Sequence, residues 1–321
     1  MRTLHKLTHT ILALVALCIM SAAALAADPG VQGPPVVSDQ YPGPILVYNY
    51  YNSSTTGSTN SRISITNADD QRGVAVHFFF IESGCSVADS FVCLSQNQTM
   101  TLLASDFDPG VEGYIIAVAT DGNGFFRPRA RLLGDEQVRF PDGQIANLGA
   151  EAMVDGITDV STAADQAAMA QRLTYPLPRV VAVSNMPSLG DGYQIKIAIN
   201  SGGGDMTGSG ARSTGTLFGL VYDELENPYS FNQAGGCFRV LTVGGASGRG
   251  FPGTSPRIGQ IIPAGAVGWM KFWPTADNGI LGSVFFANAG VAGFNGGRNL
   301  HKLTNTVRTQ DLVIPVFPPN C

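Results

Sequence analysis

The chain has 321 residues, a formal net charge of −5 and only 13% charged residues. Proteins that bind nucleic acid through its phosphates present clustered basic residues, so this acidic balance excludes a large electrostatic interface of that kind. The 39 glycines predict many tight turns. The length is enough for one large or two ordinary domains.

The N-terminal segment predicts export. Arg2 and Lys6 give it a positive start, Ile11–Met20 is a short apolar run, and Ser21–Ala27 supplies the small residues that a signal peptidase requires. We therefore expect residues 1–27 to be a signal peptide. The apolar run is shorter than the ~20 residues that span a bilayer, so the mature chain is expected in the periplasm, on the cell surface or outside the cell, without a membrane span.

Residues 28–44 contain five prolines, which do not easily join a central sheet ladder, and we expect an extended arm there. The apolar segment Ile45–Tyr51 follows directly and predicts a strand. This strand must pair either with its own domain or, as in filament subunits that donate a strand, with a neighbouring molecule.

Period-two alternation of apolar and polar residues predicts half-buried strands through the rest of the chain. The clearest segments are Ile63–Asn67, Val74–Phe80, Tyr114–Val118 and Tyr193–Ile199. Turn sequences rich in Gly and Asn lie between the strands, at 108–110, 121–124, 191–192 and 277–279. Antiparallel hairpins are the expected result.

The order of these segments repeats loosely along the chain. Strands ending at Asn67, starting at Val74, and covering Phe91–Leu94 and Gly113–Val118 are matched in order by Ile195–Asn200, Leu217–Tyr222, Cys237–Leu241 and Gly268–Trp273. Two unrelated β-sandwiches could share this order by chance. Between the two sets, Ser161–Leu173 predicts a short Ala-rich helix.

The fold class expected from these patterns is all-β, with two tandem antiparallel β-sandwich domains. The first domain is expected over residues 45–158 and the second over residues 179–321. A helical linker over residues 159–178 is expected to join them.

Several segments along the chain carry a resemblance to known proteins: Asn60–Asn67, Val76–Phe80, Cys85, Cys93, Leu94, Leu103–Asp106, Asp108–Gly110, Gly113–Ile115, Ile314–Pro319 and Cys321. In these segments the chain resembles secreted bacterial immunoglobulin-like β-sandwich proteins of unassigned activity. The resemblance covers most of the mature chain and implies its fold and its bacterial, exported source. It carries no catalytic motif and implies no chemistry.

Four cysteines remain after the predicted signal peptide, and an even number in an oxidising compartment predicts disulfides. Four cysteines allow three pairings. We expect pairing within each half, Cys85 with Cys93 and Cys237 with Cys321. The spacing fits neither a redox C-x-x-C motif nor a zinc site, so these bonds are expected to be structural.

Histidine content argues against an enzyme. Beyond the predicted signal peptide only His77 and His301 occur, and neither lies in a G-x-S-x-G or H-E-x-x-H motif. A glycosidase would need only two carboxylates, ~5 to 9.5 Å apart across a cleft. The candidates for that alternative are Asp106, Asp108, Asp135 and Glu136.

No cofactor is expected, apart from calcium as a weak alternative. Asp106 and Asp108 could offer oxygens to Ca²⁺, and Asp121 with Asn123 resembles a fragment of a calcium loop that lacks the later bidentate Glu. Turn formation explains these four residues equally well.

Arg127, Arg129 and Arg131 alternate with Pro128, Ala130 and Leu132, which predicts three guanidinium groups on one face of an edge strand. Such a stripe could hold an acidic polysaccharide. It could equally protect a sheet edge from association, or pair with the neighbouring carboxylates.

Trp269, Lys271 and Trp273 also share a strand face, which places the two indoles about 13 Å apart at ~3.3 Å per residue. This spacing could hold a glycan chain. Alternatively the tryptophans belong to the core, and Met270 and Phe272 face outward.

We therefore expect a non-catalytic exported protein with a binding or structural role in adhesion, matrix or envelope interaction. Its expected partners are surface polysaccharide or another envelope protein, without nucleic acid. The alternatives are a carbohydrate-active enzyme, a carbohydrate-binding module, and a filament subunit that uses donor-strand pairing.

Overall fold

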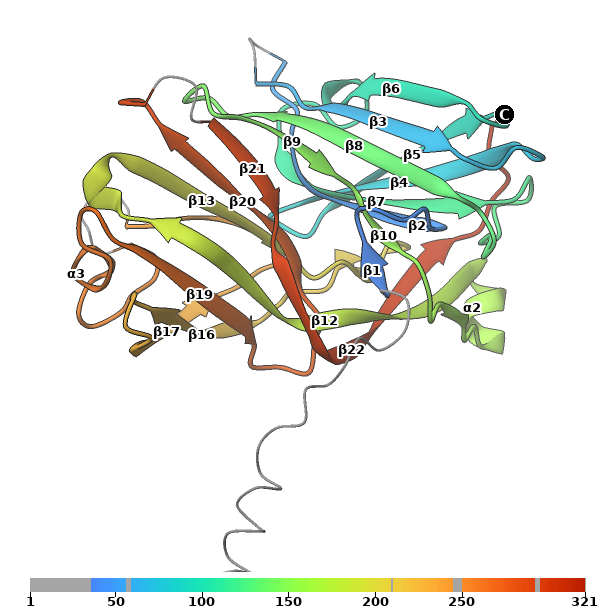
Figure 1. Ribbon diagram of the computed structural model, residues 1–321. Helices are drawn as coiled ribbons and strands as arrows, with labels where there is room; N and C mark the ends of the chain where they lie inside the picture. Colours follow the sequence, from blue (N-terminus) through green and yellow to red (C-terminus); the bar gives the residue numbers. More distant parts are fainter. Residues whose placement is uncertain (1–35, 56–58, 209, 245–249, 292–294, 321) are drawn as a thin grey trace, which may run out of the picture. The chain divides into compact units, whose positions relative to one another are not determined.

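The computed structural model describes residues 36–55, 59–208, 210–244, 250–291 and 295–320, and for residues 304–306 it describes the backbone alone. These residues form several antiparallel sheets with little helix (Figure 1), so the all-β prediction is confirmed. The predicted signal peptide, the start of the predicted arm and Cys321 lie outside the described residues. No helix in the described ranges is long and apolar enough to cross a membrane.

The first half of the described chain contains two sheets that enclose a core. One has the strand order β1 (Val37–Ser38), β10 (Glu151–Met153), β2 (Ile45–Asn52), β7 (Glu112–Thr120), β4 (Val74–Glu82), β5 (Val87–Leu94). The other has the order β6 (Thr99–Leu103), β3 (Arg62–Asn67), β8 (Leu132–Arg139), β9 (Ile145–Gly149), and the short helix η1 (Ala104–Asp106) follows β6. Alternate residues of each strand fill the space between the sheets, as the period-two pattern predicts.

The second half contains two more sheets. The larger has the order β15 (Gly210–Ala211), β14 (Gly204–Asp205), β22 (His301–Pro315), β12 (Ala170–Pro187), β19 (Val267–Pro274), β16 (Thr216–Tyr222), β17 (Pro228–Ala234), with β11 (Thr158–Asp159) paired to β12. The smaller has the order β18 (Phe238–Thr242), β13 (Tyr193–Asn200), β20 (Leu281–Asn288), β21 (Asn295–Asn299). Three short helices complete it: α2 (Ala163–Ala167), η2 (Leu189–Asp191) and α3 (Ile258–Ile261).

The strand order of the first half recurs in the second. The run β10-β2-β7-β4-β5 corresponds to β22-β12-β19-β16-β17, and β6-β3-β8-β9 corresponds to β18-β13-β20-β21. Three of the four matches made from the sequence agree with this order. The fourth differs, because the cysteine strand Phe91–Leu94 belongs to β5, whose counterpart is β17 and not the segment Cys237–Leu241.

The predicted helix Ser161–Leu173 is wrong in its second part. The helix α2 covers only Ala163–Ala167, where Thr162 and Asp165 form a capping box. The strand β12 begins at Ala170 and pairs with β22, and this pairing buries Leu173 opposite Leu312. Alanine is a good helix former, but helix propensity contributes little free energy per residue, and burial of apolar side chains in a sheet outweighs it.

The predicted strand after the arm is β2, and it pairs within its own chain. It lies between β10 and β7, with Ile45 opposite Met153 on one side and Val118 on the other. The described end of the predicted arm also packs on this half, since Val37 pairs with Met153 through β1 and Gly43 forms a bridge with Leu132. Both edges of β2 are therefore paired within this chain, and β2 is not a strand donated to a neighbouring molecule.

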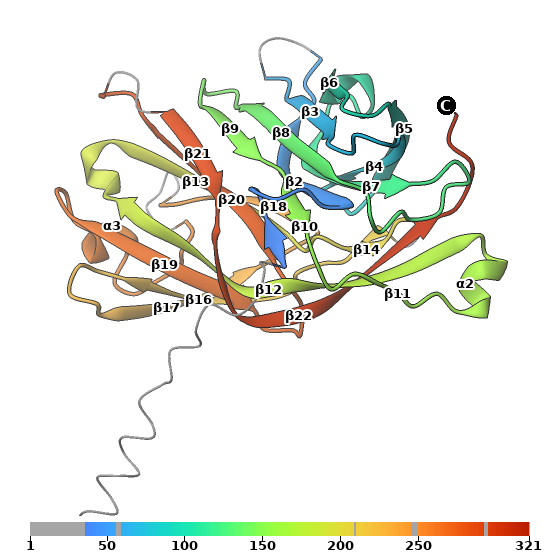
Figure 2. The same cartoon turned by 45° about the vertical axis from the view of Figure 1, so that its right-hand side comes forward.

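A third core cluster joins the two halves. It contains Tyr50 and Tyr114 of the first half and Phe238 and Phe285 of the second, with ring centroids of Tyr50 and Phe285 5.7 Å apart. The strands β12 and β22 run from the β19 side of the second half to α2, below β2 and β7 in both views (Figure 2). The described residues therefore have three apolar core clusters, and one of them contains side chains of both halves.

The predicted disulfide pairing is wrong. Cys85 bonds to Cys237, so the bond crosses between the halves. Cys85 lies in the turn of the β4–β5 hairpin, whereas Cys93 lies opposite Ala75 near the other end. The seven residues from Val87 to Cys93 span about 20 Å in a strand, at ~3.3 Å per step, which is too far for a disulfide. Cys93 is also disulfide-bonded.

Candidate functional site

The two tryptophans lie on the outer face of the large sheet of the second half. Met270 and Phe272 of β19 are fully buried in the core of this half. Because successive side chains of a strand point to opposite faces, Trp269, Lys271 and Trp273 point away from that core. All three are half-buried. The alternative in which Met270 and Phe272 face outward is wrong.

The neighbouring strand β16 places further aromatic side chains beside the tryptophans. Phe218 lies opposite Trp273, and Tyr222 lies opposite Trp269. The rings of Phe218 and Trp273 meet edge to face with centroids 5.2 Å apart, and those of Tyr222 and Trp269 stack at 4.2 Å. We call the set the aromatic face: Phe218, Leu220, Tyr222, Trp269, Lys271 and Trp273.

Sequence reasoning missed Phe218 and Tyr222. The sequence did contain a sign of them, because the strand Thr216–Tyr222 has apolar residues at both odd and even positions and is therefore apolar on both faces. Leu217 and Val221 fill the core, so the alternate apolar residues must face outward. A strand that is apolar on both sides, next to a strand with two tryptophans, indicates a sheet whose outer face is also apolar.

Lys271 lies at the centre of the aromatic face. Its Nζ atom is 5.5 Å from the ring centroid of Tyr222 and 5.7 Å from that of Trp269, within the range of a cation–π contact. The two aromatic pairs lie on either side of this lysine, about 13 Å apart at ~3.3 Å per residue. β16, β17 and β19 lie at the lower left in both views (Figure 1, Figure 2).

The equivalent face of the first half is covered. On β4 and β7, the counterparts of β16 and β19, the residues of that face include Phe79, Tyr114 and Ile116, and they are buried in the cluster that joins the halves. Leu173 and Leu312 of the paired strands β12 and β22 belong to the same cluster. No residue of the aromatic face belongs to a core cluster of the described chain. The outer face of β4 and β7 is therefore buried, whereas the corresponding face of β16 and β19, the aromatic face, is accessible.

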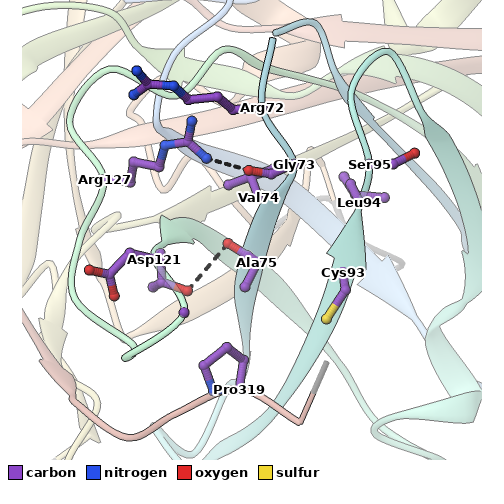
Figure 3. Close-up of a pocket in the computed structure, with 12 residues that line it drawn as sticks. Arg72, Gly73, Val74, Ala75, Cys93, Leu94, Ser95, Asp121, Arg127 and Pro319 are labelled. Carbon is purple, nitrogen blue, oxygen red and sulfur yellow. Dashed lines mark hydrogen bonds between the residues drawn. The ribbon is translucent and has the colours of Figure 1, made fainter. Parts of the chain in front are cut away.

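A pocket of about 620 Å³ lies in the first half, at the ends of β4, β5 and β7 (Figure 3). Arg127 donates from Nη1 to the carbonyl oxygen of Gly73, and its Nη2 lies 3.4 Å from Asp69 Oδ2. Thr120 donates to the carbonyl oxygen of Ala75 at 3.3 Å. These contacts hold the start of β4 against the end of β7 and the segment that follows it, so Arg127 and Thr120 serve the fold.

The predicted arginine stripe is wrong. Arg127, Arg129 and Arg131 lie in the connection between β7 and β8, not on a strand. The amide of Ala130 donates to the carbonyl oxygen of Arg127 at 3.2 Å, so the segment turns. A turn at Pro128 breaks the alternation that would align the guanidinium groups.

The candidate carboxylates do not face one another across a pocket. Asp135 and Glu136 both line a pocket of about 280 Å³, but as neighbours on β8 they point to opposite faces. The Glu136 side chain points inward, and burial raises its pKa well above the usual value for a glutamate. Asp106 lies in η1, and Asp108 accepts a hydrogen bond from the Tyr51 hydroxyl.

The calcium candidates also hold turns. The Oδ1 atom of Asp121 accepts hydrogen bonds from the amides of Asn123 at 2.8 Å and Phe125 at 3.0 Å. Within the described ranges, no group of three or more His, Cys, Asp or Glu side chains is placed to hold a metal ion.

His77 is fully buried in an aromatic cluster. Its ring stacks on Phe91 at 3.9 Å and packs against Phe79 and Phe317. Its Nε2 atom lies 2.7 Å from Asp89 Oδ2. Burial lowers the pKa of His77, and the hydrogen bond and charge of Asp89 oppose that shift. A ring without solvent exposure is not placed to exchange a proton with a substrate.

Comparison with known proteins gives no family. No family model matches the chain, and no curated protein matches it. Two solved structures of a lectin from Pleurotus ostreatus are similar to it. The complex with GalNAc has 9% identity and a TM-score of 0.18, covering 91% of this chain and 85% of that chain; the apo form has 10% identity and a TM-score of 0.18, covering 87% and 82%. These scores are too low to establish a shared fold or a shared ligand.

Proposed function

We propose that the chain is a non-catalytic, exported glycan-binding protein that binds its ligand on the aromatic face. The observation that carries this proposal is the pair of cross-strand aromatic contacts, Phe218 with Trp273 and Tyr222 with Trp269, half-buried on an outer sheet face. The face of an aromatic ring carries negative partial charge and attracts the polarised C–H groups on the face of a sugar ring. Large aromatic side chains held on a rigid sheet offer such surfaces at little cost in conformational entropy.

The spacing of the two aromatic pairs favours an extended ligand. A single sugar cannot contact rings that are about 13 Å apart at ~3.3 Å per residue, so an oligosaccharide or polysaccharide is needed to use both pairs. The open sheet face also suits a chain-like ligand better than a small molecule, which prefers an enclosed pocket.

The proposal includes the location and the domain type. A disulfide between Cys85 and Cys237 suits an oxidising compartment, which supports export through the predicted signal peptide. The repeated strand order supports two sandwiches of the immunoglobulin-like type that arose by duplication. Bacterial origin stays an expectation of the sequence resemblance.

Two other functions receive less support. A carbohydrate-active enzyme requires carboxylates that face a shared cleft, and Asp135 and Glu136 point to opposite faces of β8. A filament subunit with donor-strand pairing requires an unpaired strand, and β2 pairs on both sides within its own chain.

Binding to immobilised polysaccharides tests the proposal. A panel of neutral and acidic polysaccharides is run with the mature protein and with Trp269→Ala and Trp273→Ala variants. We expect each variant to lose about tenfold in affinity, from the lost ring surface and stacking energy. The matched control is Phe125→Ala, which removes an aromatic side chain that is 50% exposed on the other half.

Equal binding by all variants would contradict the proposal. So would a mature protein that is dimeric in light scattering and becomes monomeric on Trp269→Ala, because the aromatic face would then be a protein interface.

A further inference from the structure

Lys271 is the charged residue at the centre of the aromatic face, and its neighbours across the sheet cannot neutralise it. Ala182 of β12 lies beside it on one side, and Leu220 of β16 lies on the other. The same row continues to His301 of β22 and Ser230 of β17. This row carries no carboxylate.

The other described lysines each have a carboxylate partner. Lys196 pairs with Asp142, and Lys302 pairs with Glu151, which is only 1% exposed. Lys271 takes part in no ion pair with a described residue. Its ammonium group lies beside the rings of Tyr222 and Trp269 instead.

Three of the acidic side chains near the face along the chain make contacts elsewhere. Asp223, directly after Tyr222, accepts hydrogen bonds from the amides of Leu225 and Asn227. Glu224 accepts from the amide of Val267 at 2.9 Å. Asp277, beyond Trp273, pairs with Arg308.

From this arrangement we infer that the aromatic face selects glycans that carry negative charge, and that Lys271 binds the carboxylate or sulfate of the sugar lying between the two aromatic pairs. This inference rests on the proposed function and names the class of ligand. The chain has a net charge of −5, so it repels a polyanion overall. Binding of a negatively charged glycan therefore needs a local cation that attracts it. Charge complementarity at one half-buried lysine supplies that attraction.

Paired ligands that differ only in charge test the inference. Polygalacturonate is compared with its methyl ester, and dextran sulfate with dextran. The mature protein is expected to prefer the charged member of at least one pair, and 0.5 M NaCl should weaken this preference because salt screens the ion pair. Preference in the first pair alone identifies a carboxylate as the anion, and preference in the second pair alone identifies a sulfate.

The variant Lys271→Gln removes the charge while keeping most of the side chain. We expect it to reduce the ratio of charged to neutral affinity about fivefold, the loss typical of one accessible ion pair. The matched control is Arg129→Gln, which removes an exposed positive charge outside the aromatic face and should leave the ratio unchanged.

The outcomes separate the inference from the proposed function. If the tryptophan variants lose binding but the mature protein does not distinguish charged from neutral ligands, the inference fails and the proposed function stands. If Lys271→Gln and Arg129→Gln reduce the ratio equally, the preference is a property of total charge and the inference fails. If no variant of the aromatic face changes binding to any ligand, both fail.

Discussion

Cys85 and Cys237 form a disulfide although they are 152 positions apart, and their Cα atoms are separated by 5.4 Å. Cys85 lies in the turn between β4 and β5, and Cys237 directly precedes β18. The bond therefore closes a loop that contains strands of both halves. A long closed loop restricts the unfolded chain far more than the short Cys85–Cys93 loop expected from the sequence.

Replacing both of these cysteines with serine should lower the free energy of unfolding by about 4 kcal/mol, because the unfolded chain gains the entropy of a long open loop. Urea denaturation of the Cys85→Ser/Cys237→Ser variant against the native protein measures the loss. The paired variant is preferable to a reducing agent, which would also open the disulfide of Cys93. An unchanged midpoint would contradict a structural role for the bond.

Non-reducing peptide mapping of the mature protein should recover one peptide pair that joins Cys85 to Cys237. Cys93 is also disulfide-bonded, and removal of the predicted signal peptide with Cys18 leaves Cys321 as the remaining cysteine. We therefore expect the second peptide pair to join Cys93 to Cys321. A peptide that joins Cys85 to Cys93 would overturn the described topology.

The buried His77 should make stability depend on pH. Burial lowers its pKa in the folded state from the usual 6.5, so between the folded pKa and 6.5 the unfolded chain binds more protons. The contribution of His77 to the free energy of unfolding should therefore be full above 6.5 and be lost as the pH decreases through that window. Urea denaturation at a series of pH values measures the slope, and His77→Phe should flatten it. If the native protein instead gains stability relative to His77→Phe on acidification in this window, the attraction of Asp89 outweighs burial.

The shared core should make the two halves unfold together. Phe285 packs against Tyr50 at 5.7 Å and Phe140 at 4.8 Å, so it joins the halves directly. Phe285→Ala should cost about 4 kcal/mol, typical for a buried phenylalanine. Tryptophan fluorescence reports only the second half, which contains both tryptophans, and far-ultraviolet circular dichroism reports the whole chain. The two transitions should coincide in the native protein, and separated midpoints would contradict a common core.

The period-two patterns predicted strands well where one face is buried and the other is polar. Ile63 and Ile65 are buried as expected, with Ser64 and Thr66 on the outer face. The pattern could not give partners, because pairing between strands depends on the three-dimensional register. Cys85 and Cys93 are close in sequence, yet the hairpin holds them far apart, whereas Cys237 arrives from the other half.

The candidate site was predicted only in part, because its remaining residues come from a strand whose pairing the sequence does not show. Alternation along one strand placed Trp269, Lys271 and Trp273 on one face, but it could not decide whether that face is buried. Phe218 and Tyr222 complete the site from a neighbouring strand, and only the register of β16 with β19 brings them there. The arginine stripe failed because a local turn at Arg127 to Ala130 interrupts an alternation that the sequence shows without a break.

The length of β12 and β22 has a mechanical consequence. Their pairing runs from Ala182 opposite His301, in the row of Lys271, to Ala170 opposite Pro315 near the first half. If the aromatic face binds a glycan as proposed, a pull on that glycan would act on β19, on its partner β12 and, through β12, on β22. Where that pull runs parallel to the strands, it loads their cross-strand hydrogen bonds together in shear, a geometry that resists tension better than bonds opened one after another. The paired strands β12 and β22 would then carry tension between the proposed binding face and the first half of the chain.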